Sequence, residues 1–453
     1  MRLQQDVNAP QRTLNDLPEF NFTWEDIDGG KYIPKIVDFS LEHGSIFRFR
    51  IEQLNGPLTG IMLVGPDANR FVFNTQRQAF SHEQGWTPIL GGMVGRGLIN
   101  MDDPDHAVHR KMWNPAFTTD VMQAYIPVLH RIIAQKIETY AQQPHINTHV
   151  ESQEITFDVA AAALAGIQQG PVLDRLRALF WRMLHADDIN SEDDYLAMMS
   201  EVQGEMVPML IGLIEERRSR PPSTKDVLSQ IVHAEFEDGS KLDNIQILGH
   251  LNVLLLAGHE TTTSLSSWLI YQLATLEDHW AELQTEVDEV LADIPIGQTD
   301  AGFPADKLRK LVKLENFIKE TGRLYSPVFQ VPRILLEDVV YEDVLIPAGT
   351  RARLSLAATH MNPEIFSQPE SFDPERFAPP RREDRARPYS LVTFGGGPRM
   401  CIGINFAMFE VKILAAQILR HYQLEAVSRP DKVHVGYWNS APKYPLEVAF
   451  RPR

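Results

Sequence analysis

Apolar residues along the chain first occur in short runs and then recur at helical spacing. The runs IFRFRI at 46–51 and GIMLV at 60–64 are rich in β-formers, and the turn-like LNGP lies between them. From about 105 to 325 apolar positions recur three and four apart, as in residues 123–143, which predicts helices. Short strand patterns then return, and the tail from Leu424 predicts β-hairpins. The pattern therefore predicts a mainly α protein with a minor β portion.

One predicted helix is much longer than the others. Asp243 and Gln246 form a capping-box pair, and the helical pattern then continues for about 35 residues, or ~50 Å. A helix of that length must cross the whole body of the protein. The polar, proline-bearing segment RRSRPPSTKD at 217–226 is expected to be a loop. Because no linker-like composition separates the parts, we expect one large domain over residues 1–453.

Composition and charge narrow the classes of function. Hydrophobic residues make up 43% of the 453 residues, enough for a large core. The formal charge of −17 argues against binding to nucleic acid or anionic membranes. The first residues lack the apolar core of a signal peptide, and the most apolar stretch, near 251–257, is too short to span a bilayer. We therefore expect a cytoplasmic protein with no membrane anchor.

The only cysteine, Cys401, lies in the glycine-rich segment FGGGPRMCIG, which runs from Phe394 to Gly403. Glycines allow a tight turn and a close backbone approach. A helix is predicted from about Ile404 to His421, and its N-terminus would stabilise a thiolate, which is a soft metal ligand. A single cysteine also excludes an intramolecular disulfide framework. The alternative is a small buried cysteine in an ordinary turn.

The complete spacing F-x-x-G-x-R-x-C-x-G resembles the heme-binding loop of the cytochrome P-450 superfamily. Other landmarks follow in the family's order from about residue 30 to the C-terminus. The resemblance implies the cytochrome P-450 fold, with the long central helix over a heme b (iron protoporphyrin IX). It implies that the Cys401 thiolate is the axial iron ligand, that Phe394 and Gly403 belong to the cofactor-binding loop, and that Arg399 meets a heme propionate.

A second motif, Ala257-Gly-His-Glu260-Thr261-Thr, lies inside the long helix. Its glycine and threonines are poor helix formers and weaken the helix interior. A glutamate beside an apolar run is costly unless it is paired or reaches water, so we expect a local distortion that admits water. The resemblance implies that Thr261 hydrogen-bonds bound O2 and its water, that Glu260 relays protons, and that Ala257 borders the cofactor. The alternative is a kinked core helix with solvent-facing polar residues.

Two further sets of charged residues match the family's order. Glu320 and Arg323 lie three apart on one helix face, a pattern with little meaning alone. The resemblance adds Arg376 and implies a buried structural network behind the cysteine loop. The second set consists of propionate-binding residues, which the resemblance places at these positions: His106, Arg110 and Arg333.

Apolar residues predominate in the stretches that line the distal pocket in the family. They are Phe80, Trp86, Ile89, Leu90, Met93, Leu98, Ile99, Leu256, Val328, Phe329 and Trp438. Such a pocket suits a lipophilic molecule such as a fatty acid, a terpenoid or retinoid, or a steroid. The sequence is therefore interpreted as a heme-thiolate monooxygenase that inserts one oxygen atom from O2 into such a substrate.

Electrons would come from a separate ferredoxin or flavodoxin with its reductase, because no such domain is fused to the chain. Its docking site is expected to be a basic patch formed by Arg110, Lys111, Lys319 and Lys412. Two alternatives remain open from the sequence. A peroxide-using or isomerising relative would share the heme and thiolate, although the Glu260–Thr261 pair argues against it. A heme-free helical binding protein would make the cysteine loop a coincidence.

Overall fold

The computed structural model describes residues 12–28, 30–52, 56–184, 191–222, 226–296, 302–428, 433–435, 440–442 and 445–453. The helices are α1 (Trp24–Asp28), α2 (Tyr32–His43), α3 (Pro66–Arg70), α4 (Glu83–Val94), α5 (Asp105–Trp113), α6 (Thr119–Ile137), α7 (Thr148–Ala165), α8 (Pro171–Leu184), α9 (Glu192–Ser219), α10 (Val227–Ile231), α11 (Asn244–Thr275), α12 (Glu277–Val290), α13 (Ala305–Lys310), α14 (Val312–Leu324), α15 (Leu356–His360), α16 (Glu383–Ala386) and α17 (Ile404–His421). The strands are β1 (Glu19–Phe22), β2 (Ile46–Ile51), β3 (Leu58–Val64), β4 (Phe80–Ser81), β5 (Ile146–Asn147), β6 (Gln330–Leu335), β7 (Val339–Tyr341), β8 (Val344–Ile346), β9 (Arg351–Ser355), β10 (Tyr422–Ala426), β11 (Val433–Val435), β12 (Ser440–Pro442) and β13 (Glu447–Pro452). The prediction of a mainly α protein is confirmed.

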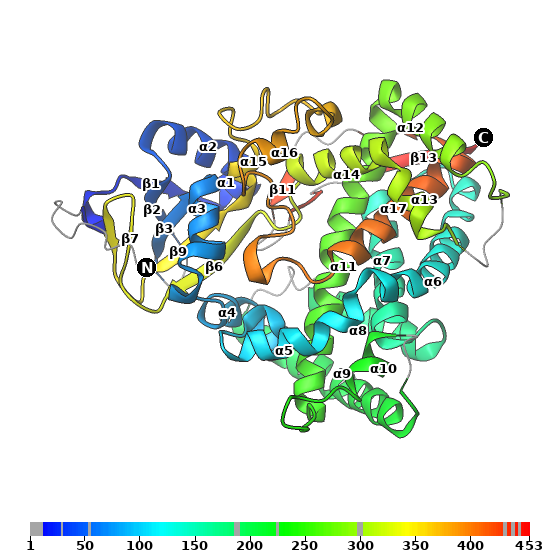
Figure 1. The fold of residues 1–453 in the computed structure, drawn as a ribbon, viewed down its shortest axis with the longest axis horizontal. Coiled ribbons are helices and arrows are strands. Elements are labelled where there is room, and N and C mark those ends of the chain that lie inside the picture. The colour runs from blue at the N-terminus through cyan, green and yellow to red at the C-terminus, as the bar shows by residue number, and fades with distance from the viewer. Residues whose placement is uncertain are drawn as a thin grey trace.

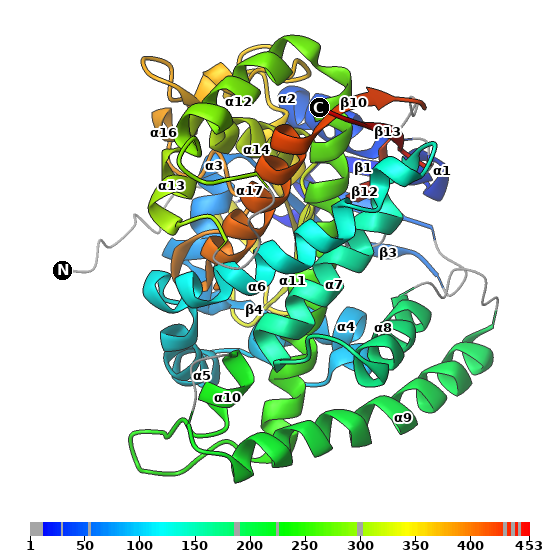
Figure 2. The same cartoon turned by 90° about the vertical axis from the view of Figure 1, so that its right-hand side faces the viewer.

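The long predicted helix is α11, with 32 residues. Its capping box is present: the Gln246 amide donates to Asp243 Oδ1 at 2.8 Å, and the Asp243 amide donates to Gln246 Oε1 at 2.9 Å. The helix packs along α7 and also contacts α9, α14 and α17. Figures 1 and 2 show it crossing the body of the molecule. Because it is surrounded by other helices, most of its side chains are buried on every face.

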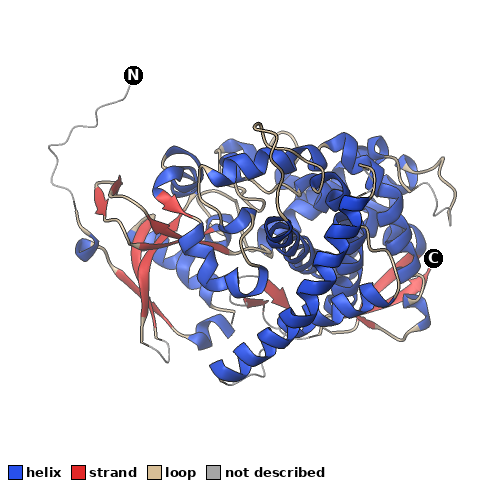
Figure 3. Ribbon diagram, turned by 90° about the horizontal axis from the view of Figure 1, so that it is seen from below, coloured by secondary structure: helices blue, strands red, loops and turns tan. Residues whose placement is uncertain are grey.

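The main sheet lies to one side of the helices, where the red strands gather in Figure 3. Its strand order is β1-β2-β3-β9-β6-β4, and the predicted strands at 46–51 and 60–64 are the antiparallel pair β2 and β3. On one face of this sheet a second core cluster forms around Phe20, Phe47 and Phe49, with α2 packed against it. The sheet also fixes the position of β6, which carries Arg333.

Two local predictions have different outcomes. The expected β-hairpins of the tail are confirmed, since β10 pairs with β13 and β11 pairs with β12, both antiparallel. The expected loop at 217–226 is partly wrong, because α9 continues through Arg217 to Ser219. Arg217 is buried and lies 3.7 Å from Asp226 Oδ2, so charged residues that looked like a solvated loop in fact pack inside. Among the described residues, no helix is long and apolar enough to cross a membrane.

Candidate active site

A backbone hydrogen bond closes the loop around Cys401. The Cys401 amide donates to the carbonyl oxygen of Phe394 at 2.9 Å. At Gly397 the backbone has a φ of +64°, and a Cβ there would lie 2.2 Å from the carbonyl oxygen of Phe73. Only glycine fits so close to another segment in that conformation. The loop ends at Gly403, the residue that precedes α17.

Many protein atoms surround the accessible side chain of Cys401. Part of the side chain is exposed. The surrounding protein nevertheless removes the thiol from bulk water, and this raises its pKa. A backbone hydrogen bond from Gly403 and the positive charge of Arg110 act against that rise in pKa. Arg110 also donates from Nη2 to the Met400 carbonyl oxygen at 2.8 Å, so it holds the cysteine loop. These surroundings fit a thiolate bound to a metal ion, which would take the place of the thiol proton.

In the middle of α11 the side of the helix at Ala257, Gly258 and Thr261 is partly accessible, although the helix is buried on both sides of this motif. These positions lie three and four residues apart, so they form one partly accessible face on an otherwise buried helix. The Thr261 hydroxyl donates to the Ala257 carbonyl oxygen at 2.7 Å, which leaves its own oxygen able to accept a hydrogen bond. Thr263 instead pairs with Thr156 of α7 at 2.7 Å. The helix is continuous through the motif, as expected of the long helix, and the local distortion that would admit water stays a prediction.

Glu260 is buried and has a partner on its own helix. Its Oε1 lies 3.4 Å from Nδ1 of His259, and the His259 ring meets Phe157 of α7 edge-on. A carboxyl group removed from water needs such a polar neighbour. The structure places the His259 ring beside this carboxylate, and the expectation that Glu260 is paired or reaches water stays a prediction.

Three of the predicted propionate-binding residues lie in one group. His106 Nδ1 is 3.5 Å and Arg399 Nη2 is 3.4 Å from the same oxygen, Oδ1 of Asp103. Arg399 also donates to the Met101 carbonyl oxygen at 2.6 Å. Burial, and next the charge of Arg399, lower the pKa of Arg333 to about 9. Asp103 thus offsets part of the positive charge of this group. Within the group it forms ion pairs with His106 and Arg399, and not with Arg333.

Arg333 is the residue that best fits an anionic cofactor. It is 3% exposed, and within the described part of the chain its Nη1 donates only to the neighbouring Pro332 carbonyl oxygen and its Nε has no hydrogen-bond partner. No carboxylate among the described residues forms an ion pair with it. A buried guanidinium left without an anion is strongly destabilising. The site therefore suits a carboxylate brought by a bound group, such as a heme propionate.

His82 belongs to the same group and was missed from the sequence. It follows β4, whose Ser81 is paired with Ile334, so the register places His82 opposite Arg333. Burial, followed by the charge of Arg333 and Arg399, lowers the pKa of His82 well below its ordinary value. No local sequence pattern indicates a pairing between residues so far apart in the chain.

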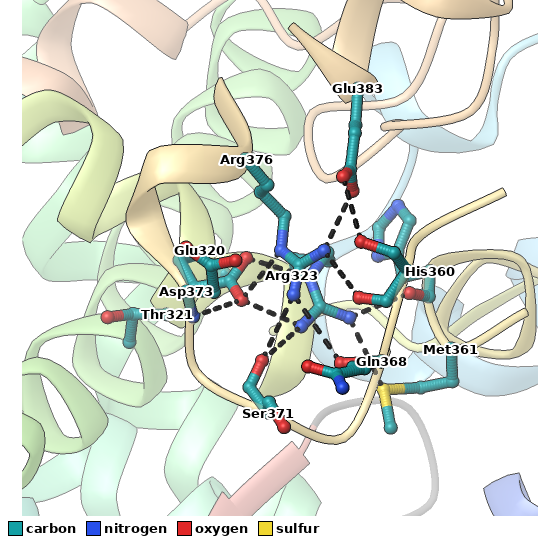
Figure 4. Close-up of polar contacts among 12 residues, drawn as sticks. Glu320, Thr321, Arg323, His360, Met361, Gln368, Ser371, Asp373, Arg376 and Glu383 are labelled. Atoms are coloured by element: carbon teal, nitrogen blue, oxygen red, sulfur yellow. Dashed lines mark hydrogen bonds and ion pairs between the residues drawn. The ribbon is translucent and has the colours of Figure 1, made fainter. Parts of the chain in front are cut away.

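Glu320, Arg323 and Arg376 form the predicted network (Figure 4). Arg323 donates to both oxygens of Glu320 at 2.8 Å, and Arg376 Nε donates to Glu320 Oε1 at 3.0 Å. The Asp373 amide adds a further hydrogen bond at 2.9 Å. The three charged side chains are 0% exposed. Arg376 also pairs with Glu383 at 2.7 Å, so the two guanidinium groups face two carboxylates.

His360 connects this network to the segment that leads into the cysteine loop. This role of His360 was not predicted from the sequence. Arg323 Nη1 donates to the His360 carbonyl oxygen at 2.9 Å, while the Val392 amide donates to His360 Nε2 at 2.9 Å. His360 Nδ1 lies 2.8 Å from Ser326 Oγ. Because Nε2 accepts, Nδ1 must carry the proton of the neutral ring and donate to Ser326. Burial lowers the pKa of His360 to about 3, which keeps the ring neutral.

The predicted pocket residues do not all belong together. Those in the main core, buried or partly buried, are Phe80, Trp86, Ile89, Leu90, Met93, Leu98, Ile99, Leu256 and Val328. Phe329 instead packs in the second core cluster beside Tyr32, which corrects its assignment to the same pocket. Trp438 lies outside the described residues.

The expected basic patch beside the cysteine loop is not supported by the positions of its lysines. Lys412 is buried and donates to the Leu308 carbonyl oxygen and to Glu315 at 2.9 and 2.8 Å. Lys319 is paired with Glu315 as well, and Lys111 with Glu237. A hollow of about 740 Å³ borders the loop on this side. Its charges are of both signs, so the surface is not simply basic.

Replacing Lys412 by methionine should therefore lower stability and should not remove a docking charge. The substitution leaves the buried Leu308 carbonyl oxygen without its donor, which should cost about 1–3 kcal/mol of unfolding free energy. Urea unfolding measures this loss, with the exposed Lys310→Met as the control. An unchanged unfolding curve combined with a lower salt dependence of electron transfer would restore the docking role.

Comparison with known proteins gives one consistent result. The sequence profile of the family described as Cytochrome P450 matches residues 20–445. The chain is 27% identical to the putative cytochrome P450 136 of Mycobacterium tuberculosis, covering 87% of this chain and 80% of that protein. It is 26% identical to the sterol 14alpha-demethylase of Mycolicibacterium vanbaalenii, with 92% and 96% covered. The fold is similar to retinoic acid-bound cyanobacterial CYP120A1, with a TM-score of 0.85, 24% identity, and 98% and 100% covered.

Proposed function

The chain belongs to the cytochrome P450 family and is a cytochrome P450 monooxygenase, and we propose that Cys401 is the axial thiolate of its heme b. The observation that carries this proposal is the position of the only cysteine, which is exposed in a loop that a backbone hydrogen bond closes and that Arg110 holds. The same proposal assigns the propionates to Arg333, Arg399, His106 and, as an addition, His82. We further propose that residues 1–453 act as one catalytic domain.

A heme bound in this site would supply the activation of O2. The protein would supply the protons and keep the reaction away from bulk water. Thr261 has its hydroxyl hydrogen directed at the Ala257 carbonyl oxygen, so its oxygen can accept a hydrogen bond from a water on the accessible face of α11. Glu260, one residue earlier and held by His259, is the titratable group that can resupply protons to that water. Glu320, Arg323 and Arg376 act at a distance, by fixing the chain that carries the cysteine loop.

The substrate class that we propose is a lipophilic molecule such as a fatty acid, a terpenoid or retinoid, or a steroid. Support comes from the apolar side chains that α4 and its following turn contribute to the core, among them Trp86, Leu90 and Leu98. One similar protein is named as a sterol 14alpha-demethylase, and the solved structure with a similar fold is described as retinoic acid-bound. A separate ferredoxin or flavodoxin would deliver electrons, and the hollow beside the cysteine loop is the surface that we propose for its docking.

The decisive test of this function is the Thr261→Ala variant. Its heme should load normally and it should consume reductant, because no core contact is lost. Less product should form per electron and more hydrogen peroxide should be released, because the hydroxyl that orders the proton-donating water is gone. Product and peroxide are measured together for wild type and variant, with Thr263→Ala as the control, since Thr263 contacts α7 instead. Unchanged coupling, with a faster reaction driven by peroxide than by reductase, would instead favour a peroxygenase.

A further inference from the structure

A second cavity lies where α4, α9 and α11 meet. Its volume is about 450 Å³, within the usual range for small-molecule sites. Apolar side chains line much of it, including Met93 of α4, Met206 of α9 and Leu248 of α11. Figure 2 shows α4 and α9 near the lower part of α11. The Gln203 side chain donates to the Gly92 carbonyl oxygen and so links α9 to α4 across the cavity.

Close backbone packing builds one wall of this cavity. A Cβ at Gly249 of α11 would lie 2.1 Å from the Arg96 carbonyl oxygen. A Cβ at Gly97 would lie 2.7 Å from Val253 Cγ2. These glycines let the segment after α4 rest directly on α11. The cavity is therefore a space between tightly packed elements and not a loosely packed region.

One polar group that lines the cavity is an acceptor without a partner. Asn252 of α11 is 5% exposed, and its Oδ1 has no hydrogen-bond partner among the described residues. Leaving a buried acceptor unsatisfied is costly, so such groups are normally paired with protein, water or ligand. The Asn252 carboxamide is therefore positioned to receive a hydrogen bond from an occupant of the cavity.

A histidine pair supplies the complementary donor. His109 Nδ1 lies 2.8 Å from His250 Nε2, and His250 Nδ1 is buried with no hydrogen-bond partner in the described ranges. Burial lowers the pKa of both rings, to about 3 for His250, so both are neutral. An orphaned N–H is rarer in proteins than an orphaned acceptor, so His250 carries its proton on Nε2 and donates it to His109. The ring proton of His109 is then on Nε2, which makes this nitrogen a donor. His109 is one of the residues that line the cavity.

The charges around the cavity argue against an ionic ligand. Arg96 is the only described lining residue with a permanent charge, and it is already paired with Asp105 at 2.8 Å and Glu83 at 3.5 Å. A carboxylate would therefore find no free cation, and an ammonium group would find no free carboxylate. A hydroxyl group meets both requirements, since it accepts one hydrogen bond and donates another.

We propose that this cavity is a binding site for a neutral lipophilic alcohol, with Asn252 accepting from the hydroxyl group and His109 donating to it. The biological role of this site rests on the proposed function, because the product of a hydroxylation carries a hydroxyl group that its substrate lacks. The site would therefore hold product in preference to substrate, next to the α4 residues that we assign to the substrate pocket.

The test uses two small probes of similar shape, 4-fluorobenzyl alcohol and 4-fluorotoluene. Fluorine NMR titration of the heme-loaded enzyme measures the affinity for each. The wild type should bind the alcohol about three- to tenfold more tightly, the range expected of a net hydrogen bond. Asn252→Leu, which keeps the size of the side chain, should reduce that preference to near one without weakening 4-fluorotoluene.

A second variant keeps the test decisive if Asn252→Leu does not fold. Ile245 lines the cavity but is 69% exposed, so Ile245→Trp should fold normally and block the opening. It should weaken alcohol binding at least as much as Asn252→Leu. Equal binding of both probes to the wild type, or an alcohol affinity that Ile245→Trp leaves unchanged, would overturn the proposal. The reduced, CO-bound spectrum of the same samples reports the thiolate separately, so failure of this site and failure of the proposed function are distinguishable.

Discussion

Replacing Cys401 by serine will abolish the thiolate signature in the spectrum of the reduced, CO-bound enzyme and, with it, oxygen insertion. The chain has one cysteine, so no other thiolate can take its place. A serine hydroxyl stays protonated near neutral pH and is a harder, weaker ligand than a thiolate. The loop itself should remain closed, since its hydrogen bond to Phe394 uses the backbone of residue 401.

The neighbouring residue supplies the control for this experiment. Met400 is 43% exposed and contacts Arg110 through its backbone, so Met400→Leu, which stays apolar, should keep the spectrum. Heme content is measured for both variants, so that loss of the signature is separated from loss of the cofactor. A Cys401→Ser protein that retained the thiolate signature would show that the assignment of the iron ligand is wrong.

The sequence predicted well the features that depend on local signals. The capping box at Asp243 defines the start of α11, and the bounds of α17 agree with the predicted Ile404–His421. The glycine-rich segment before Cys401 demanded a tight turn, and Gly397 shows the close approach that such a turn allows. These signals lie within a few residues of the feature that they determine, so one chain without relatives is enough to recognise them.

Features that depend on distant contacts could not be predicted in the same way. His82 and His360 owe their positions to a strand pairing and to hydrogen bonds that join remote segments. Phe329 looked like a pocket residue, but the sheet turns it toward the core cluster beside Tyr32. Each of these placements follows from the tertiary fold, which the local sequence does not encode.

The expected surface position of Lys412 is wrong, although the sequence contains a pattern that indicates burial. The segment around it, EVKILAAQIL, is apolar at seven of ten positions, which leaves little of the helix to face water. α17 is in fact buried along most of its length, packed on α6, α11 and α12. A lysine within it had to find a carboxylate inside the protein, and Glu315 is that partner. The family resemblance suggested a surface role where the hydrophobic pattern indicated burial.

Replacing Glu320 by alanine should yield a protein that fails to retain heme. The two guanidinium groups of Arg323 and Arg376 would remain at 0% exposure with no carboxylate between them. Breaking a buried charged network in this way costs about 3–5 kcal/mol, a large part of a typical stability of about 5–15 kcal/mol. Glu383 cannot compensate for both arginines, because among the described residues it pairs with Arg376 and not with Arg323. Loss of the network also frees the chain at His360, which holds Val392 next to the cysteine loop.

The matched control for Glu320→Ala is an ion pair of the same chemistry at the surface. Asp306 and Lys310 lie 3.6 Å apart on α13 and are both well exposed, so Asp306→Ala should not measurably change unfolding. Glu320→Gln separates charge from hydrogen bonding: it keeps a side-chain oxygen for one arginine but removes the negative charge, so its loss of stability should approach that of alanine. The measurements are the ratio of heme to protein and the midpoint of urea unfolding. A Glu320→Ala protein with full heme content and an unchanged midpoint would contradict the structural role, because a buried pair of arginines would then have proved stable without its carboxylate.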